Sequence, residues 1–143
     1  RFEKRAETEN TIYIDDYAHH PNEIKALLES VKELFPNRKI VAIFQPHLFS
    51  RTKDLAEDFA KHLSIADEVL LMPIYPAREN PMKGVTSDLI LKELSVEGKI
   101  VEKVDLISEV KAIIENNEPK VILTIGAGDI DRFTPLVVNE INK

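Results

Sequence analysis

The stretch Lys39–Phe44 reads KIVAIF, and it decides the fold class of the chain. The five residues after the lysine are apolar without a break, which is typical of a strand covered on both faces. Such strands lie inside parallel sheets, because the crossover connections of parallel sheets place helices on both sides. We therefore expect the segments that flank Lys39–Phe44 to be helices.

Both flanking segments have the apolar spacing of helices. Asn22–Phe35 carries one stripe of apolar residues three and four positions apart, and Pro36 stops it. Arg51–Leu63 carries a second stripe, with Ser50 or Thr52 as the candidate cap at its start. Helix, buried strand and helix therefore follow one another in this part of the chain.

The same alternation continues over nearly the whole sequence and gives five strands and five helices. The expected strands are Thr11–Ile14, Lys39–Phe44, Glu68–Met72, Lys99–Lys103 and Val121–Ile125. The three remaining helices are Ser87–Ser95, Leu106–Asn116 and a last one that runs to about Asn142. This order predicts an α/β fold with a doubly wound, mostly parallel sheet and helices on both faces.

Residues 1–10 (RFEKRAETEN) lack apolar periodicity, and we expect a tail or a junction with a preceding domain there. Residues 11–143 then form one domain of ordinary size. The chain begins with Arg1 rather than Met, and no signal-peptide pattern follows. We therefore expect a piece of a longer protein.

The composition excludes several classes of protein. The chain has 143 residues, of which 43% are hydrophobic and 31% charged, and it lacks the run of about 20 apolar residues that a transmembrane helix needs. Its net charge of −6 argues against binding to nucleic acid. The absence of cysteine excludes disulfides and fits a reducing compartment. We expect a cytoplasmic protein with no nucleic acid or membrane as partner.

Polar loops follow the expected strands at their carboxyl ends, where doubly wound sheets bind ligands. In Asp15–Pro21 (DDYAHHP), a carboxylate can bind the hydroxyls of a ribose. An imidazole at the start of the next helix can bind a phosphate. The alternative is an ordinary turn, with Pro21 as the first helical residue. The adjacent His19 and His20 do not predict a metal site, because neighbours in sequence rarely face one ion.

The loop Gln45–Thr52 (QPHLFSRT) places His47 and Arg51 at the same edge of the sheet. The fork of an arginine can hold a carboxylate or a phosphate at two points, although a lone arginine is more often a solvated surface residue. His47 directly follows the buried strand at the expected ligand edge. The loop is therefore a candidate anion site.

Two further loops lie at this edge. Pro73–Gly84 is long and irregular, which indicates a lid or an interdomain contact with Tyr75, Arg78 and Glu79 as polar candidates. Gly126–Asp129 (GAGD) is either a phosphate-cradling turn or, as we favour, a tight turn with Asp129 as a helix cap. No glycine starts a Walker phosphate loop, so the chain has no ATPase machinery of its own.

Four motifs in this order carry a family resemblance. They are DDYAHHP (15–21), FQPHLFSRT (44–52), YPA (75–77) and GAGDI (126–130). Together they resemble the carboxy-terminal domain of the Mur ligase family, in the branch that joins L-alanine to UDP-N-acetylmuramate in peptidoglycan synthesis. Phe2-Glu3 resembles the end of that family's central domain, so the resemblance covers essentially the whole chain.

The resemblance implies a Rossmann-like domain of a three-domain, ATP-dependent ligase. The first domain of the family binds the UDP-sugar, and the central domain holds most of ATP and Mg²⁺. The muramyl carboxylate becomes an acyl phosphate, which the amine of L-alanine attacks, with release of ADP and phosphate. The implied partners are L-alanine, UDP-N-acetylmuramate, ATP and the two other domains of the same chain. This domain is expected to be inactive alone.

The family's residue roles are carried over by position. Asp16 is expected to contact the ATP ribose, and His20 to lie near the phosphates. The alanine pocket is expected to be lined by Tyr17, His19, His47 and Arg51, with Arg51 paired to the alanine carboxylate. Many members carry a second arginine directly after the histidine of the FQPH motif, where this chain has Leu48. No catalytic residue and no metal ligand are assigned to this domain.

Three alternatives remain at this point. A murein-peptide ligase shares the DDYAHHP pattern (15–21) but not the FQPH pattern (44–47), which disfavours it. A standalone nucleotide- or amino-acid-binding module without catalysis also fits the missing phosphate loop. The third is a regulatory or protein-interaction domain that uses Pro73–Gly84.

Overall fold

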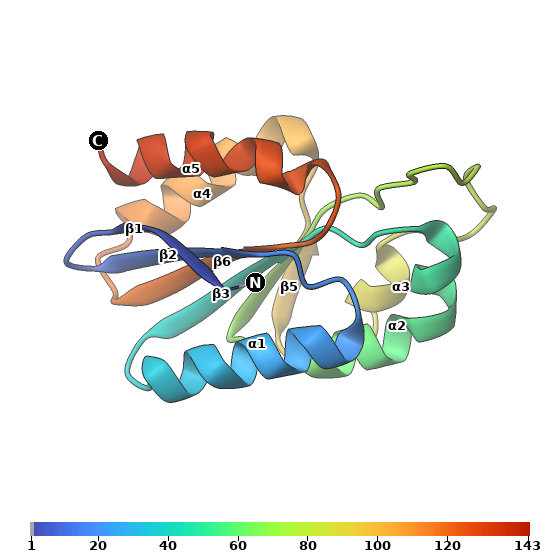
Figure 1. Cartoon of the computed structure of the whole chain (residues 1–143), viewed down its shortest axis with the longest axis horizontal. Coiled ribbons are helices and arrows are strands. Elements are labelled where there is room, and N and C mark those ends of the chain that lie inside the picture. Colours follow the sequence, from blue (N-terminus) through green and yellow to red (C-terminus); the bar gives the residue numbers. More distant parts are fainter. Residues whose placement is uncertain (1) are drawn as a thin grey trace.

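The computed structural model describes residues 2–143 and contains a six-stranded sheet between two layers of helices (Figure 1). The strands are β1 (Glu3–Glu7), β2 (Thr11–Asp16), β3 (Lys39–Phe44), β4 (Glu68–Leu71), β5 (Glu97–Ile100) and β6 (Lys120–Ile125). The helices are α1 (Pro21–Leu34), α2 (Phe49–Leu63), α3 (Asp88–Leu91), α4 (Leu106–Glu115) and α5 (Thr134–Ile141). Two 3₁₀ turns, η1 (Lys103–Asp105) and η2 (Asp129–Phe133), precede α4 and α5.

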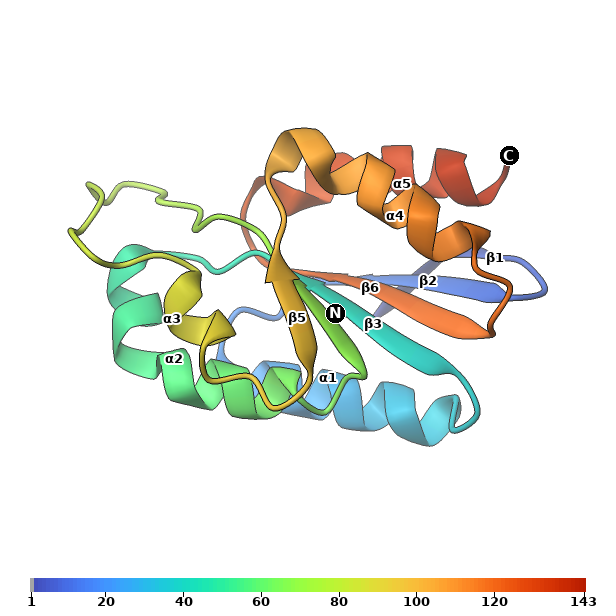
Figure 2. The same ribbon diagram turned by 180° about the vertical axis from the view of Figure 1, so that it is seen from behind.

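The strand order in the sheet is β1-β2-β6-β3-β4-β5. Every pair from β2 onward is parallel, and β6 lies between β2 and β3 although it is the last strand in sequence. Helices α1, α2 and α3 cover one face of the sheet, and α4 and α5 cover the other (Figures 1 and 2). The prediction of a doubly wound, mostly parallel α/β fold is confirmed.

The first ten residues differ from the prediction. Glu3–Glu7 is a strand, β1, which pairs antiparallel with β2 so that Glu3 lies opposite Asp15. The five predicted strands therefore missed this one, whose residues were assigned to a tail or a domain junction. Charged residues predominate in β1 because it is the edge strand, so it lacks the apolar alternation of a half-buried strand. Whether residues 1–10 also join a preceding domain stays a prediction.

Elsewhere, two elements are shorter or shifted. The expected strand Lys99–Lys103 lies at Glu97–Ile100, and the expected helix Ser87–Ser95 is reduced to Asp88–Leu91. Both lie at the β5 edge of the sheet, where burial is incomplete and the apolar pattern is weak. No helix within residues 2–143 is long and apolar enough to cross a membrane.

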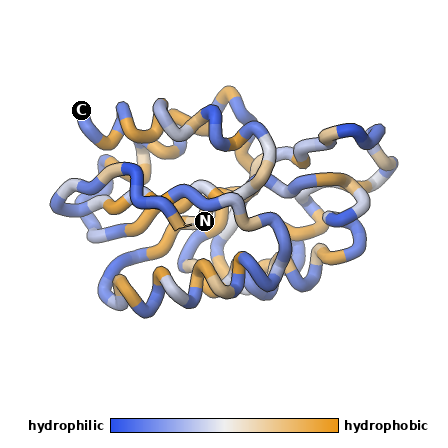
Figure 3. Tube along the Cα trace, viewed as in Figure 1, coloured by the Kyte–Doolittle hydropathy of each residue, from blue (hydrophilic) through white to orange (hydrophobic). Residues whose placement is uncertain are grey.

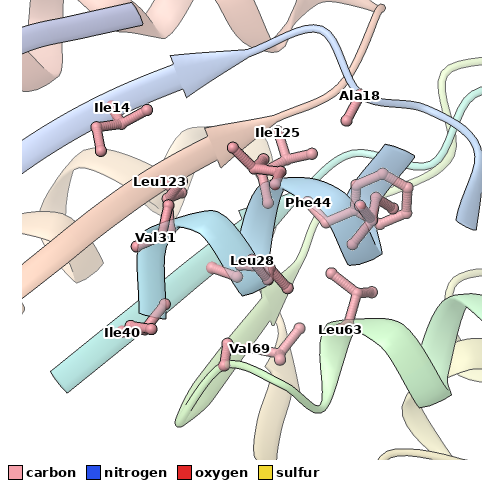
Figure 4. Packing of buried hydrophobic residues seen from close by; sticks show 14 of the residues in the cluster. Ile14, Ala18, Leu28, Val31, Ile40, Phe44, Leu63, Val69, Leu123 and Ile125 are labelled. Atoms are coloured by element: carbon pink, nitrogen blue, oxygen red, sulfur yellow. The ribbon is translucent and has the colours of Figure 1, made fainter. Parts of the chain in front are cut away.

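Two apolar cores lie on the two faces of the sheet, and β3 contributes to both. Ile40, Ala42 and Phe44 face the core under α1 and α2, whereas Ile43 faces the core under α4 and α5. This division follows the two-residue period of a strand. Figure 3 shows the apolar residues gathered along the strands, and Figure 4 shows Phe44 among side chains of α1, α2 and β6. The KIVAIF stretch is thus covered on both faces, as predicted.

Candidate functional site

The carboxyl ends of β2, β6 and β3 lie side by side, and the chain leaves them in different directions. The segments after β2 and β3 lead to α1 and α2 on one face, whereas the segment after β6 leads to α5 on the other (Figures 1 and 2). A doubly wound sheet binds its ligand where neighbouring connections diverge in this way. The candidate site is therefore built from the loops after β2, β3, β4 and β6.

The loop after β2 is held by hydrogen bonds between residues close in sequence. The Ala18 N–H donates to Oδ1 of Asp16 over 2.8 Å, so this carboxylate, only 8% exposed, closes a turn. Oε1 of Glu23 accepts the backbone N–H groups of His19 and His20 at 3.1 and 3.0 Å. These N–H groups lower the pKa of the Glu23 carboxyl. The loop therefore ends at a well-formed start of α1.

Outside these turns, the same loop carries three rings, those of Tyr17, His19 and His20, at the carboxyl edge of the sheet. Tyr17 is 46% exposed, and the His20 ring lies beside the His19 ring with 4.9 Å between the centroids. A cavity of about 230 Å³ adjoins Tyr17, and the ion pair of Asp15 with Arg5 forms part of its wall. The region of Tyr17 therefore offers a polar recess next to the end of β2.

The loop after β3 brings His47 and Arg51 together. The Arg51 guanidinium donates through Nη1 to Nδ1 of His47 over 3.1 Å. The His47 ring stacks on Tyr75 at 5.6 Å between centroids and meets His19 edge-on at 6.1 Å. Burial first, and then the charge of Arg51, lowers the pKa of His47, so this imidazole is neutral at pH 7. Of the residues predicted for the alanine pocket, three thus form one cluster: His19, His47 and Arg51.

Tyr75 joins the loops after β3 and β4. Its backbone N–H donates to Pro46 at 2.8 Å, and its carbonyl accepts the Leu48 N–H at 2.9 Å. His47 and Tyr75 therefore pair like residues of two short parallel strands. Tyr75 was only one of several candidates in the sequence, and the structure places it directly under His47. Arg78, in contrast, lies exposed in a turn.

Gln45 is a central residue of this edge that the sequence did not single out. Its fully buried side chain donates to Oδ1 of Asp129 at 2.6 Å and accepts the Ile130 N–H at 3.0 Å. A Cβ on Gly128 would lie 2.5 Å from Gln45 Oε1 and 2.6 Å from Tyr75 Cγ. A larger residue at Gly128 would therefore displace these two side chains, under which the loop after β6 passes. An uninterrupted apolar strand that ends in glutamine was the available signal.

The turn interpretation of GAGD is confirmed, but the role expected for Asp129 is wrong. The segment turns the chain from β6 into η2, and η2 has no side-chain cap. The Asp129 carboxylate instead accepts hydrogen bonds from Gln45 and Lys103. It is drawn away from the helix start because the buried amide of Gln45 needs an acceptor.

The start of α2 also differs from the prediction. The helix begins at Phe49, after Leu48, so neither Ser50 nor Thr52 is its cap. Thr52 donates its hydroxyl back to the Leu48 carbonyl at 2.8 Å. Ser50 donates its backbone N–H to Oε1 of Glu79 at 3.1 Å. Among residues 2–143, no group of three or more histidines and carboxylates is arranged to hold a metal ion.

The family described as "Mur ligase, glutamate ligase domain" matches residues 1–128 of this chain. The chain belongs to the Mur ligase family. This Mur ligase domain is 50% identical, over its whole length, to the UDP-N-acetylmuramate–L-alanine ligase of Flavobacterium johnsoniae. Over 93% of its length it is 52% identical to the ligase of the same name from Porphyromonas gingivalis. It spans 31% and 29% of those two proteins, and the prediction of a Mur ligase carboxy-terminal domain is confirmed.

Solved structures agree with this assignment. A UDP-N-acetylmuramate–alanine ligase of Thermotoga maritima matches with a TM-score of 0.75 and 37% identity, over 99% of this Mur ligase domain and 30% of that chain. A murein peptide ligase of Psychrobacter arcticus matches with a TM-score of 0.76 but 18% identity, over 99% of this domain and 29% of that chain. The second similarity shows the common fold alone, whereas the higher identities are to proteins named as alanine ligases.

Proposed function

We propose that this domain provides the amino-acid site and part of the ATP site of a UDP-N-acetylmuramate–L-alanine ligase in the cytoplasm. The observation that carries the proposal is the cluster of His19, His47 and Arg51, which joins two loops at the ligand edge of the sheet. A guanidinium beside two imidazoles matches a small amino acid, which has one carboxylate and one amine.

In the proposed complex, Arg51 binds the alanine carboxylate through the planar fork of its guanidinium. Its hydrogen bond to His47 restrains that fork, which reduces the entropy that is lost on binding. Because Nδ1 of His47 accepts the hydrogen bond from Arg51, the ring carries its proton on Nε2, and this N–H can donate to the substrate carboxylate. His19 donates its Nδ1–H to the Tyr17 carbonyl and has Nε2 left for the substrate amine, and Tyr17 adds an exposed ring to the same rim.

The part of the ATP site that this domain supplies is proposed at the start of α1. Asp16 ends β2 with its carboxylate at the carboxyl edge and is proposed to contact the ribose, and His20 at the helix start is proposed to lie near the phosphates. The remainder of ATP, together with Mg²⁺, is proposed to be held by the central domain. ATP supplies the phosphoryl group that activates the muramyl carboxylate.

Exposed apolar residues at the carboxyl edge support the presence of the other two domains. Val104 follows β5 and is 90% exposed, Tyr17 follows β2, and Met82 lies in the loop after β4. Phe2 is also exposed and precedes Glu3, which lies opposite Asp15 near the end of β2. Apolar side chains on one edge favour a protein partner there. Closure onto that partner would exclude water from the acyl phosphate.

Steady-state kinetics of the intact ligase test these roles. Arg51→Ala is expected to raise the KM for L-alanine about tenfold to a hundredfold, as for the loss of a charge-assisted bidentate contact, with a smaller effect on the KM for ATP. Asp16→Ala is expected to do the reverse. Arg38→Ala, at the opposite edge of the sheet, is the matched control. Equal effects of Arg51→Ala on both substrates would remove its proposed role.

The isolated 143-residue chain gives a second test. It contains no phosphate loop, so it is expected to fold but to release no phosphate from ATP, with or without L-alanine. Alanine-dependent phosphate release by the purified chain would contradict the division of labour between the domains.

A further inference from the structure

The N-terminus of α2 is capped by a residue from a distant loop. Leu48, the residue before the helix, has a φ of +75° and a side chain that cannot accept a hydrogen bond. The first N–H groups of a helix need acceptors, and here Glu79 supplies them. Its Oε1 accepts the Ser50 N–H at 3.1 Å, and its Oε2 accepts the Ser50 hydroxyl.

The loop after β4 holds Glu79 in this position. The Glu79 N–H donates to the Pro76 carbonyl at 2.9 Å, which closes a turn in which Ala77 has a φ of +54°. One residue before Pro76, Tyr75 stacks on His47. The same short segment therefore fixes both the ring under His47 and the carboxylate at the start of α2.

Glu79 is a fixed negative charge next to the group proposed to bind the substrate carboxylate. The hydrogen bonds from Ser50 lower the pKa of the Glu79 carboxyl, so it is ionised at neutral pH. Arg51 directly follows Ser50 on the first turn of α2, yet its guanidinium donates to His47. The Arg51 side chain is therefore bonded to His47, whereas Glu79 is bonded to the N-terminus of α2.

We propose that Glu79 is a specificity-determining residue, which makes this edge a site for amino acids with one carboxylate. The inference rests on the proposed function. Glu79 accepts the hydrogen bond of the first N–H groups of α2, so these donors are not available to the substrate carboxylate. The carboxylate therefore binds Arg51. Glu79 bonds to Ser50, the residue before Arg51, and the charge of Arg51 acts on its carboxyl, so a second carboxylate on a substrate bound at Arg51 would be repelled by Glu79. Small uncharged amino acids avoid that cost.

Competition with L-alanine in the intact ligase tests the proposal. L-aspartate and L-asparagine are the probes, because they have nearly the same shape and differ in charge. The measured quantity is the ratio of their inhibition constants against L-alanine. Glu79→Gln keeps an acceptor for the Ser50 N–H but removes the charge, and it is expected to shift the ratio about three- to fivefold in favour of L-aspartate.

Glu57→Gln is the matched control. It makes the same change of charge on the exposed side of α2, about two turns beyond Ser50. At that distance from Arg51, it is expected to leave the ratio of inhibition constants within about twofold of the original value. The ratio compares two ligands on one protein, so a general loss of stability does not move it. An unchanged ratio in Glu79→Gln, or no inhibition by either probe in any variant, overturns the inference.

Two other outcomes separate this inference from the proposed function. If Arg51→Ala leaves the KM for L-alanine unchanged, the amino-acid site itself is wrong and the inference fails with it. If Arg51→Ala raises that KM but Glu79→Gln does not shift the ratio, only the inference fails. Amide hydrogen exchange in the 143-residue chain tests the cap separately: Ser50 N–H is expected to exchange faster in Glu79→Ala than in Glu79→Gln.

Discussion

Two loops leave the same edge of the sheet and lead into helices on the same face, but they are held in different ways. The loop after β2 is closed by its own residues and by Glu23, within the first turn of the helix that follows. The loop after β3 is held by residues far away in the sequence: Gln45 bonds to Asp129, and His47 stacks on Tyr75.

This difference shows where the geometry of the candidate site originates. A loop with local hydrogen bonds keeps its shape as long as its own sequence is intact. A loop with distant contacts depends on the whole edge, so a change after β6 is transmitted to His47 and Arg51. Mutations should therefore have local effects in the first loop and spreading effects in the second.

The largest expected effect is that of Gln45→Ala. The change removes a fully buried side chain and leaves the Ile130 N–H without its acceptor, which is expected to lower the free energy of unfolding by about 2–4 kcal/mol. Urea denaturation of the 143-residue chain measures this loss. The ring signals of His47 and Tyr75 in the NMR spectrum should shift as well. A loss below about 1 kcal/mol would contradict the central place of Gln45.

Gly128→Ala is expected to cost about 1–3 kcal/mol, because the added methyl group would press on Gln45 and Tyr75. Gly84→Ala is the control, since its φ of +77° is strained for alanine but no atom lies within 4 Å of the added group. Both variants should lose stability, and only Gly128→Ala should shift the ring signals of His47. If both leave His47 unchanged, the loops after β6 and β3 are not coupled.

Glu23→Ala tests the first loop and should cost only about 0.5–1 kcal/mol, as for the loss of an exposed helix cap. Its effect on backbone amide shifts should be confined to His19, His20 and the first turn of α1. Glu23→Gln keeps an acceptor and should recover most of the loss. Amide shifts at His47 comparable to those at His20 would show that the first loop is not held locally.

The smallest effect expected is on the titration of His47. Its folded-state pKa lies below the ordinary value of about 6.5 because of burial and of Arg51, and Arg51→Gln should raise it. The lowered pKa means that the folded state favours the neutral ring of His47. The contribution of His47 to the free energy of unfolding is therefore fully present above about pH 6.5 and is lost as the pH falls through the folded-state pKa. Two-dimensional NMR of the ring protons gives both values. An unchanged pKa in Arg51→Gln would contradict the contact.

The parts of the molecule that the sequence predicted are those with a local signal. KIVAIF gives a buried strand, the stripe of Asn22–Phe35 gives α1, and the order of strands and helices gives the loops that gather at the carboxyl edge. β1 was missed because an edge strand rich in charged residues has no apolar period. Gln45, Tyr75 and Glu79 could not be assigned, because each acts through a partner at least 28 residues away in sequence or in another loop.

The measurement that tests the account most directly is an NMR titration of the 143-residue chain with L-alanine, followed through the histidine side chains. The chain has four histidines, and His62, which contacts the Pro21 carbonyl from α2, is an internal control. The account predicts that the ring signals of His19 and His47 move together and saturate, that His62 stays in place, and that Arg51→Gln abolishes the shifts. Equal movement of His62, or no saturable shift at His47, would contradict an amino-acid site at this edge.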